Sequence, residues 1–554
     1  MFARIRSLLK PAAHLEEAAP PAIDAWVALF NQGRQEQAIA LITERLRSTQ
    51  DATTWLWLAR AYVRDGRTDD AFEAYDEALD WADDDHAAMM VGGERALAAA
   101  DGVAAEIEFR RAVALHPADA EGFRLLGSAL ALQGRHADAE SAQRAALALA
   151  PHSLVLHSGL CAAVLAARGL DAACIAHEEA IRRFPGEALL LYNFGVVLSR
   201  HNRKQAAVEA YARAVELDPD LAPASLNLAI DLFILGRYED AGAIFERRWD
   251  TAPNLKGAYV FDRARQWRGE PLAGKRILLW AEQGLGDTLQ MARYIPLVVA
   301  CGAAALHVKA PATLLRLLRQ IPGVDSWIDE RDTGDRTQFD VQCPLMSLPH
   351  VFGTTLDTVP AQAPPLVASR ELAAAWRSVL GPRAPGGPLR VGLVWSSVVW
   401  SGAGMGLVRM DKSIALAQFA PLAALTHVEW YCLQVGAGRD ELAQCPAGLA
   451  LRDPAQDIVD FADTAAIIEN LDLVLSVDTS VVHLAGAAGK PVIMLLKHTS
   501  GMFWLQDRDN SPWYPSLRIV RQNAAGDWHD AILRAADLIR RFAQTGALFE
   551  EKIA

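Results

Sequence analysis

Two hydroxyl side chains and a histidine, Thr479, Ser480 and His483, stand directly after an apolar stretch of the chain. Residues 472–477 (DLVLSV) read as a buried strand, so both hydroxyls fall where the first amides of a following helix lack partners. A diphosphate suits such a place, because hydroxyls and amides donate to its oxygens and the helix dipole favours its charge. His483 follows Thr479 by four residues, so on a helix it shares a face with Thr479 and can donate to the same phosphates.

Asp478 stands between this strand and the two hydroxyls. Its carboxylate would repel phosphate oxygens, so we expect it to bind backbone amides or a ribose. The alternative for the whole segment is an ordinary capped helix with a histidine in the core.

A second strand-to-helix turn is indicated at residues 282–288 (EQGLGDT). Gly284 and Gly286 allow the backbone to approach a ligand and expose amides at a helix start, which favours an anion. Asp287 follows the second glycine and opens the helix. Because aspartate is also a frequent N-cap, a purely structural turn is the alternative interpretation.

The first half of the chain repeats with a period of 34 residues. Proline recurs at this spacing at Pro117, Pro151, Pro185, Pro219 and Pro253. Alanine recurs in two further registers, at Ala71, Ala105, Ala139, Ala173, Ala207 and Ala241 and at Ala78, Ala112, Ala146, Ala180 and Ala214. Small residues let the two helices of each unit pack closely. The first helix of a unit is expected to end at Gly66, Gly134 or Gly236, and each proline closes a second helix. The pattern resembles the tetratricopeptide repeat, with about seven units over residues 19–255.

Repeat arrays of this kind curl into a superhelix, and family members hold peptides on its concave face. We therefore expect a polypeptide partner on the concave face of the repeats. Self-association, or a role as a rigid spacer, is the alternative.

The second half alternates short apolar strands with helical stretches, which indicates βαβ units and parallel sheets. The expected strands are 276–282, 306–309, 325–329 and 340–343 in a first lobe and 390–395, 428–433, 472–477 and 491–496 in a second. The expected helices are 287–301, 416–425, 457–470, 481–489 and 527–544. Two such lobes place a ligand cleft at the carboxyl ends of their strands.

Segments rich in proline and glycine at 360–365 and 381–388 mark the boundary between the lobes. The predicted organisation is an N-terminal extension (1–18), the repeat array (19–255), a linker (256–272), a first lobe (273–385), a second lobe (386–546) and a tail (547–554).

Four segments, in this order, resemble bacterial tetratricopeptide proteins that carry a glycosyltransferase of the ADP-heptose:lipopolysaccharide heptosyltransferase type (glycosyltransferase family 9). They are 282–296 (EQGLGDTLQMARYIP), 343–360 (CPLMSLPHVFGTTLDTVP), 478–491 (DTSVVHLAGAAGKP) and 507–522 (DRDNSPWYPSLRIVRQ). The resemblance implies an α-solenoid followed by an α/β GT-B fold of two Rossmann-like lobes. It also implies an inverting sugar transfer without metal or cofactor, with the nucleotide-sugar donor bound mainly by the second lobe.

The resemblance assigns Asp287 as the general base that takes the proton of the acceptor hydroxyl. The donor-diphosphate block of the family corresponds to Asp478, Thr479, Ser480 and His483. Lys412 stands where the family has a basic residue that neutralises charge on the leaving group. A solvated surface lysine is the alternative at that position.

Two loops depart from the family pattern. Residues 396–409 (SSVVWSGAGMGLVR) lack the usual polar segment with Arg or His, and 497–501 (KHTSG) replace the usual segment after the last core strand. Both loops should border the donor, so the identity of the sugar and of the nucleotide stays open. Residues 507–509 (DRD) spell the DxD motif of a different glycosyltransferase fold, but no suitable strand precedes them, and we interpret them as a structural loop.

Composition excludes several classes of protein. The net charge of −13 and the pI near 5.6 argue against a nucleic-acid partner. Six cysteines are scattered without a CxxC pair, which is typical of a reducing compartment. No run approaches 18 apolar residues, and the basic residues 1–10 are too short for a signal peptide, so we expect a cytoplasmic protein without a transmembrane segment.

The sequence therefore predicts a glycosyltransferase that acts on a protein held by the repeats, with flagellin or another surface protein among the candidate acceptors. A repeat-containing O-linked N-acetylglucosamine transferase is an alternative within the same class. A non-catalytic repeat scaffold with a degenerate GT-B domain is an alternative from a different class.

Overall fold

The computed structural model describes residues 23–31, 34–251, 261–332, 334, 338–360, 366–401, 406–409, 412–499 and 501–549. It divides into two compact units. The first holds the described residues up to Val197 together with Arg213–Leu221, and the second holds Leu198–Ala212 together with the described residues from Ala222 onward. The last helices of the repeat array thus belong to the same unit as the α/β part. The predicted domain limits, which follow sequence patterns, stay predictions, and the predicted extension (1–18) lies outside the described residues.

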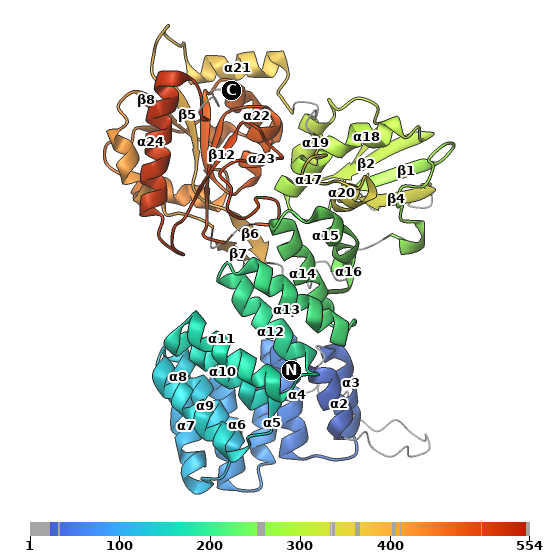
Figure 1. The fold of residues 1–554 in the computed structure, drawn as a ribbon, viewed down its shortest axis with the longest axis vertical. Helices are drawn as coiled ribbons and strands as arrows, with labels where there is room; N and C mark the ends of the chain where they lie inside the picture. Colours follow the sequence, from blue (N-terminus) through green and yellow to red (C-terminus); the bar gives the residue numbers. More distant parts are fainter. Residues whose placement is uncertain are drawn as a thin grey trace. The chain divides into compact units, whose positions relative to one another are not determined.

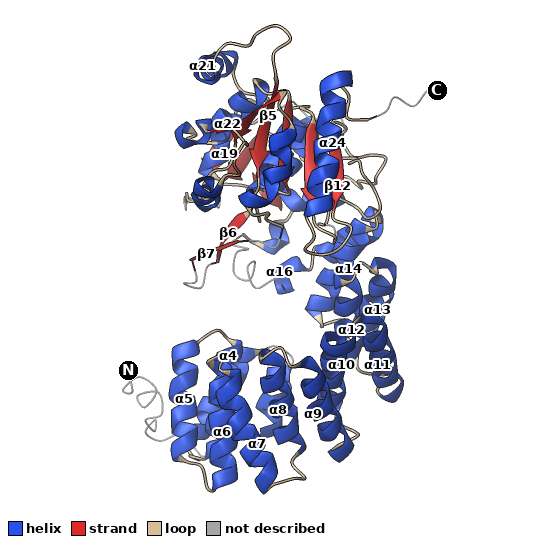
Figure 2. Ribbon diagram, turned by 90° about the vertical axis from the view of Figure 1, so that its left-hand side faces the viewer, coloured by secondary structure: helices blue, strands red, loops and turns tan. Residues whose placement is uncertain are grey.

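Fourteen consecutive helices form the described part of the array. They are α2 (Ile23–Asn31), α3 (Gln35–Leu46), α4 (Ala52–Arg64), α5 (Thr68–Asp80), α6 (Asp85–Ala98), α7 (Gly102–Leu115), α8 (Ala120–Leu132), α9 (His136–Leu149), α10 (Leu154–Arg168), α11 (Leu170–Arg183), α12 (Ala188–Arg200), α13 (Lys204–Leu217), α14 (Ala222–Ile234) and α15 (Tyr238–Phe245). Figure 2 shows α5 to α9 stacked side by side in the first unit. This arrangement confirms the predicted helical-repeat solenoid.

The packing of the repeats follows the small residues that recur in the sequence. Every alanine of the two predicted registers is buried. The glycines that end first helices take left-handed backbone angles, with φ of +76° at Gly66 and +75° at Gly134, which few other residues tolerate. The closest approach is at Gly93 in α6, where an added Cβ would lie 2.5 Å from the ring of Phe109 in α7.

The second unit contains two parallel sheets (Figure 1). In the first lobe the order is β3 (Ser326–Asp329), β2 (Ala305–Ala310), β1 (Arg276–Trp280), β4 (Val341–Pro344). Its helices are α17 (Leu285–Met291), α18 (Ile295–Ala300), α19 (Ala312–Leu318) and α20 (Leu348–Val351). Because β1 runs parallel to its neighbours β2 and β4, the turn that follows it lies at the carboxyl edge of this sheet.

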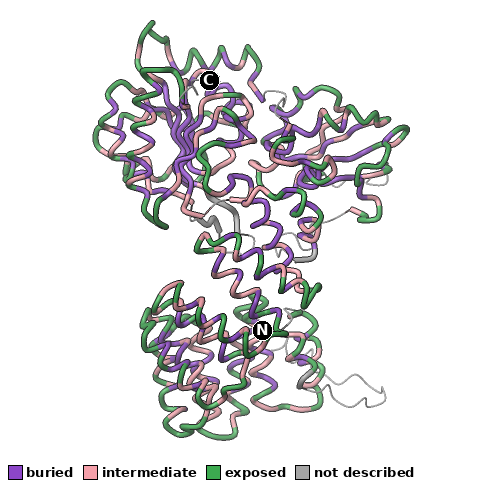
Figure 3. The backbone as a smooth tube through the Cα atoms, in the orientation of Figure 1, coloured by how far each residue is buried: buried purple, intermediate pink, exposed green. Residues whose placement is uncertain are grey.

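The second lobe has a larger sheet in the order β12 (Leu517–Arg521), β11 (Val492–Leu496), β10 (Leu473–Val477), β5 (Leu389–Val394), β8 (Val428–Cys432), β9 (Leu451–Arg452). Its helices include α21 (Arg370–Leu380), α22 (Phe461–Glu469), α23 (Ser480–Ala487) and α24 (His529–Thr545). Figure 3 shows the central strands buried along their length, and their apolar side chains form one core with the inner face of α24. Two parallel sheets, each with helices beside it, confirm the predicted two-lobed α/β fold.

Several elements differ from the predicted ones. The helix predicted over 287–301 is split into α17, a 3₁₀ turn at Ala292–Tyr294 and α18, because Pro296 has no amide hydrogen to continue the ladder. The helix predicted over 416–425 is a 3₁₀ helix, Leu416–Ala424, with Pro421 inside it. Strand β12 and the antiparallel hairpin of β6 (Val398–Ser401) and β7 (Gly406–Arg409) were not predicted. Among the described residues, no helix has the length and apolar character needed to cross a membrane.

A buried ion pair joins the end of the repeats to the first lobe. Arg248, in the short helix α16 (Arg248–Thr251), donates to both carboxylate oxygens of Glu282 at 2.9 and 2.7 Å, and to Ser347 Oγ at 2.9 Å. Burial raises the pKa of Glu282, and the guanidinium of Arg248 opposes that shift. Loss of one partner from such a pair costs about 3–5 kcal/mol, since the other charge stays buried. The pair therefore fixes the chain just before the turn at Gly284.

We expect Gly93→Ala to destabilise the array, because the new methyl group would overlap the ring of Phe109. Overpacking of this kind costs about 1–3 kcal/mol. The neighbouring Gly92 is the matched control, since its added Cβ would meet only Glu108 Cγ at 3.9 Å. Gly92→Ala should stabilise the helix by up to about 1 kcal/mol. Thermal unfolding of the two full-length variants checks the opposite signs, and equal melting temperatures would contradict this packing.

Candidate active site

The first turn of α17, in the first lobe, lies against the first turn of α23, in the second lobe. An added Cβ at Gly286 would lie 2.7 Å from Cδ2 of His483 and 3.5 Å from Cα of Ser480. A side chain larger than hydrogen at Gly286 would therefore force the two helix starts apart. The structure thus brings the two predicted turns together, which their sequence separation of almost two hundred residues does not reveal.

Asp287 lies in the first turn of α17. Its Oδ2 accepts a hydrogen bond from the amide of Gly284 at 3.0 Å, so the side chain caps the helix. Burial raises the pKa of Asp287 to about 6. The Gly284 amide and Lys412 act in the opposite direction and lower this pKa, whereas the Asp478 carboxylate raises it further. A carboxylate with a pKa near neutrality can accept a proton and release it again.

Asp478 follows β10 and is held by two donors. Its Oδ2 accepts from Lys412 Nζ at 3.1 Å, and its Oδ1 accepts from Trp504 Nε1 at 3.0 Å. Lys412 is thus paired with a carboxylate at the site and is not a solvated surface charge. The next residue, Ser413, exchanges hydrogen bonds with the backbone of Ser397, which anchors this segment beside the end of β5.

Thr479 and Ser480 begin α23 and line a cavity of about 390 Å³. Thr479 is the N-cap residue, but its side chain makes no capping bond and instead contacts Ser476 Oγ at 3.1 Å. The other walls include Ser396 and Gln434 from the second lobe and Leu285 from the first. The volume is in the range of small-molecule sites, and a helix start on the wall favours an anionic ligand.

His483 is more buried than a simple phosphate donor would be, with 8% of its surface exposed. Its Nδ1 lies 3.1 Å from the Tyr514 hydroxyl, and its ring packs against Trp504 at 5.0 Å between centroids. Burial lowers the pKa of His483 to about 4, so the ring is neutral at neutral pH. Of the predicted site residues, all of which are described, only Thr479 and Ser480 line the cavity.

Sequence reasoning missed three side chains that organise the site. Trp504 and Tyr514 hold Asp478 and His483, and Gln434 Oε1 accepts from the amides of Trp395 and Ser396 at 3.3 and 2.9 Å. The density of aromatic residues between 503 and 514 was the one available signal.

The predicted structural loop 507–509 agrees with the structure. Asp507, Arg508 and Asp509 are exposed; Arg508 contacts Asn510, and Asp509 pairs with Arg518 at 2.6 Å. Of the two loops that depart from the family pattern, residues 402–405 and 500 lie outside the described residues. In the described residues no group of three His, Cys, Asp or Glu side chains is placed to hold a metal ion.

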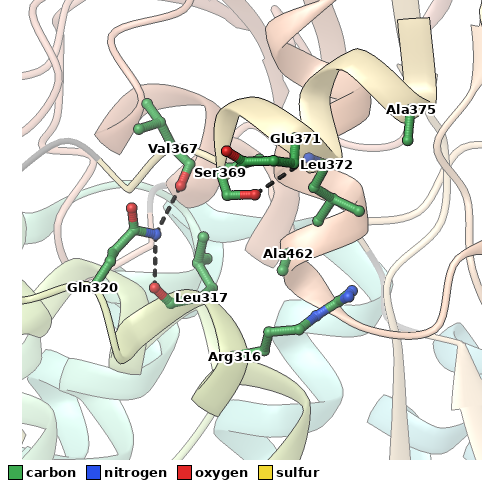
Figure 4. Close-up of a pocket in the computed structure, with 10 residues that line it drawn as sticks. Arg316, Leu317, Gln320, Val367, Ser369, Glu371, Leu372, Ala375 and Ala462 are labelled. Carbon is green, nitrogen blue, oxygen red and sulfur yellow. Dashed lines mark hydrogen bonds between the residues drawn. The ribbon is translucent and has the colours of Figure 1, made fainter. Parts of the chain in front are cut away.

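A second cavity of about 480 Å³ lies between α19, α21 and α22 (Figure 4). Arg316 on its wall pairs with Asp460 and Asp463 at 2.7 and 2.6 Å. Gln320 donates to the carbonyl oxygens of Leu317 and Val367, each at 2.7 Å. No predicted site residue lines this cavity. Its contacts connect the two lobes, and Asp460, the partner of Arg316, also lines the cavity at Thr479 and Ser480.

The fold is that of a helical-repeat array joined to a two-lobed α/β domain, which has a cavity at the start of a helix. The sequence matches the model of glycosyltransferase family 9 (heptosyltransferase) over residues 459–530. It matches a tetratricopeptide repeat model over residues 23–87, 92–153, 163–222 and 192–254. The chain therefore combines tetratricopeptide repeats with a glycosyltransferase family 9 domain.

The chain is similar to protein FlbA of Caulobacter vibrioides, with 26% identity over 465 residues, which cover 77% of this chain and 74% of FlbA. It is 28% identical to the human protein O-mannosyl-transferase TMTC1 over 152 residues, which cover 27% of this chain and 17% of that protein. The structure of a family 9 glycosyltransferase from Veillonella parvula aligns with a TM-score of 0.33 and 10% identity, over 51% of this chain and 93% of that chain.

The contact between Gly286 and His483 can be tested by a double mutant. Gly286→Ala should destabilise the chain by about 1–3 kcal/mol, because the methyl group has no space. In a His483→Ala background the ring is absent, and the same substitution should cost much less. Melting temperatures of the four full-length proteins give the coupling energy, expected at about 0.5–3 kcal/mol. Additive effects of the two substitutions would show that the residues do not touch.

Proposed function

We propose that this chain transfers a sugar from a nucleotide-activated donor to a hydroxyl group of a polypeptide held by the repeats. The family 9 domain supports glycosyltransferase activity and implies a nucleotide-sugar donor, and the repeats suggest protein binding. The single observation that carries the proposal is the position of Asp287. Its carboxylate, with a pKa raised to about 6, lies at the contact between the lobes beside the start of α23.

In the proposed reaction the acceptor hydroxyl oxygen attacks the anomeric carbon while Asp287 takes its proton. The bond from the anomeric carbon to the phosphate oxygen breaks, and the nucleotide leaves with the electron pair. One displacement of this kind inverts the configuration at the anomeric carbon. We include no metal in the mechanism, because Lys412 and the amides at the start of α23 can offset charge on the leaving group.

Thr479 and Ser480 are assigned to the donor phosphates. Their place on the cavity wall, at a helix start without a capping side chain, supports this assignment. We assign His483 an indirect role, because its ring is buried against Gly286 and its Nδ1 is engaged by Tyr514. Asp478 is assigned to holding Lys412 and Trp504, in place of the ribose contact that the sequence suggested.

We place the reaction in the cytoplasm, where nucleotide sugars occur and where the scattered cysteines fit. Flagellin or another surface protein remains a candidate acceptor, and an N-acetylglucosamine donor remains within the proposal. The experiments below also test the alternative that the chain is a non-catalytic scaffold. Its sign would be a folded chain that neither binds nor consumes any nucleotide sugar.

Asp287→Asn should reduce sugar transfer by about 10²–10⁴-fold, since asparagine keeps the acceptor for the Gly284 amide but takes no proton. Turnover is measured as nucleotide release from whichever donor the wild type consumes in a panel of ADP-, UDP-, GDP- and CMP-sugars. A base must be deprotonated to act, so wild-type kcat/KM should rise with pH through about 6, and this rise should vanish in the variant.

The matched control is Asp101→Asn, which changes a capping aspartate at the start of α7, where it accepts from Ala104 at 3.0 Å. This control should keep full turnover. Near-normal transfer by a stable Asp287→Asn protein would show that Asp287 only caps its helix.

The double substitution Thr479→Ala and Ser480→Ala removes two hydroxyl donors from the wall of the cavity. A hydrogen bond to a charged group contributes about 1.5–3 kcal/mol, so affinity for a nucleoside diphosphate should fall at least about tenfold. Isothermal titration with ADP, UDP and GDP measures the change.

Ser369→Ala is the control, because Ser369 also begins a helix but caps it, accepting from the Leu372 amide at 3.2 Å (Figure 4). This variant should bind nucleotide as the wild type does. Unchanged affinity in a folded Thr479, Ser480 double variant would move the phosphate site elsewhere.

A further inference from the structure

The segment 501–514, here called the strap, connects the end of the repeat array to the candidate active site. All of its partners discussed below lie in the second compact unit, to which Leu198–Ala212 and the helices from α14 onward belong. The strap follows the last core strand β11 and precedes β12. It contacts the repeats through Phe503, Gln506 and Trp513, and it contacts the site through Trp504 and Tyr514.

Gln506 is the residue of the strap that the repeats hold most directly. Its backbone amide donates to the carbonyl oxygen of Ile234 at the end of α14, at 3.0 Å. Its side-chain Nε2 donates to the carbonyl oxygen of Asn202, between α12 and α13, at 3.1 Å. One residue of the strap therefore binds carbonyl groups at the equivalent turns of two successive repeats, α12–α13 and α14–α15.

Aromatic packing strengthens the same attachment. Trp513 Nε1 donates to the Tyr238 hydroxyl at 2.9 Å, and Phe503 packs against Phe233 and Tyr238 of the last repeat. All four rings are buried. Aromatic pairs add about 0.5–1.5 kcal/mol each beyond their buried area, so the attachment is a packed interface within one unit.

The backbone on both sides of Gln506 is strained. Leu505 and Asp507 have φ of +55° and +57°, in the left-handed region that residues other than glycine rarely occupy. Such conformations persist only where the surroundings over-determine them, and they cluster at functional sites. The hydrogen bonds from Gln506 to the repeats help to hold this conformation, together with the bond from Arg521 to the carbonyl oxygen of Leu505 at 2.9 Å.

The other side of the strap reaches the site. Trp504, two residues before Gln506, donates from Nε1 to Asp478 Oδ1, which leaves Oδ2 for Lys412. The Trp504 ring also packs against His483, whose ring contacts Gly286. A shift of the strap would therefore move the carboxylate that holds Lys412.

Given the glycosyl transfer proposed above, we propose that the end of the repeat array is a built-in part of the donor site. In this arrangement Gln506 is a positioning residue that acts through Trp504 on Asp478. The repeats then have a second role besides holding a polypeptide, because their last turns set the position of Lys412, the cation assigned to the leaving group.

The experiment measures nucleotide affinity in full-length variants. Gln506→Ala removes the bond to Asn202 without touching the cavity, and it should weaken binding of ADP, UDP or GDP by about threefold or more. Trp504→Phe keeps an aromatic ring at this position but removes the N–H that donates to Asp478, and it should weaken binding by about tenfold. The KM for the donor should rise in both variants.

Gln320→Ala is the matched control. Gln320 also donates its amide to a main-chain carbonyl of another segment, that of Val367, and its partners in Figure 4, Leu317 and Val367, lie outside the strap. This control should lower the melting temperature as much as Gln506→Ala does, yet leave nucleotide affinity unchanged. Equal affinity losses in the two variants, or no loss in either, would overturn the positioning role.

A wild-type chain that binds none of these nucleotides would overturn the proposed function, and the link itself is then decided by hydrogen exchange. Gln506→Ala should speed amide exchange in peptides that cover the start of α23, whereas Gln320→Ala should not. Identical exchange there in both variants would overturn the link independently of any activity.

Discussion

The contact between the first turns of α17 and α23 is the constraint on which the rest of the site depends. It exists because Gly286 has no side chain, so the ring of His483 fills the space that a Cβ would need. The ring is buried against Trp504 and Tyr514, and burial keeps it neutral, so the contact is a packed one and needs no ion pair. Close-packed interiors have low compressibility, so the spacing of the two helix starts is set by packing and is insensitive to salt.

This close approach also decides the electrostatics, because it brings two carboxylates into one environment. Asp478 is paired with Lys412 and receives a second hydrogen bond from Trp504. Asp287 accepts the amide of Gly284, and burial together with the nearby Asp478 charge raises its pKa to about 6. In the mechanism proposed above, the two carboxylates have different partners and different roles, with Asp478 holding Lys412 and Asp287 accepting the proton. The division depends on Lys412 being held in place.

Sequence patterns predicted those features that local chemistry enforces. The 34-residue registers predicted the solenoid, since each recurring alanine has to be small for two helices to pack. The strands before Asp287 and Asp478 were predicted from their apolar runs, and both turns were placed correctly. Strand β12 (LRIVR) was missed because its charged residues at an edge of the sheet mask its apolar pattern. The role of His483 was left open, because a spacing of four residues from Thr479 fits a ligand contact and a core contact equally well. The pairing of Trp504 with Asp478 and of Arg248 with Glu282 joins residues 26 and 34 positions apart, and no local pattern records it.

The division into compact units shows that the repeats are not structurally equivalent, although their sequence periodicity is regular. Period alone treats every unit as equivalent, yet the helices from Ala222 onward pack with the α/β lobes. Lys204 and Asp231 form a buried ion pair at 2.9 Å within that same unit, so the last turns of the array are themselves firmly held. Arg248 then binds Glu282 just before the turn of Asp287, while Gln506 carries the other attachment toward Asp478. The end of the array thus supports both carboxylates of the site, one through each lobe, and nearest-neighbour stacking of identical repeats cannot supply either attachment.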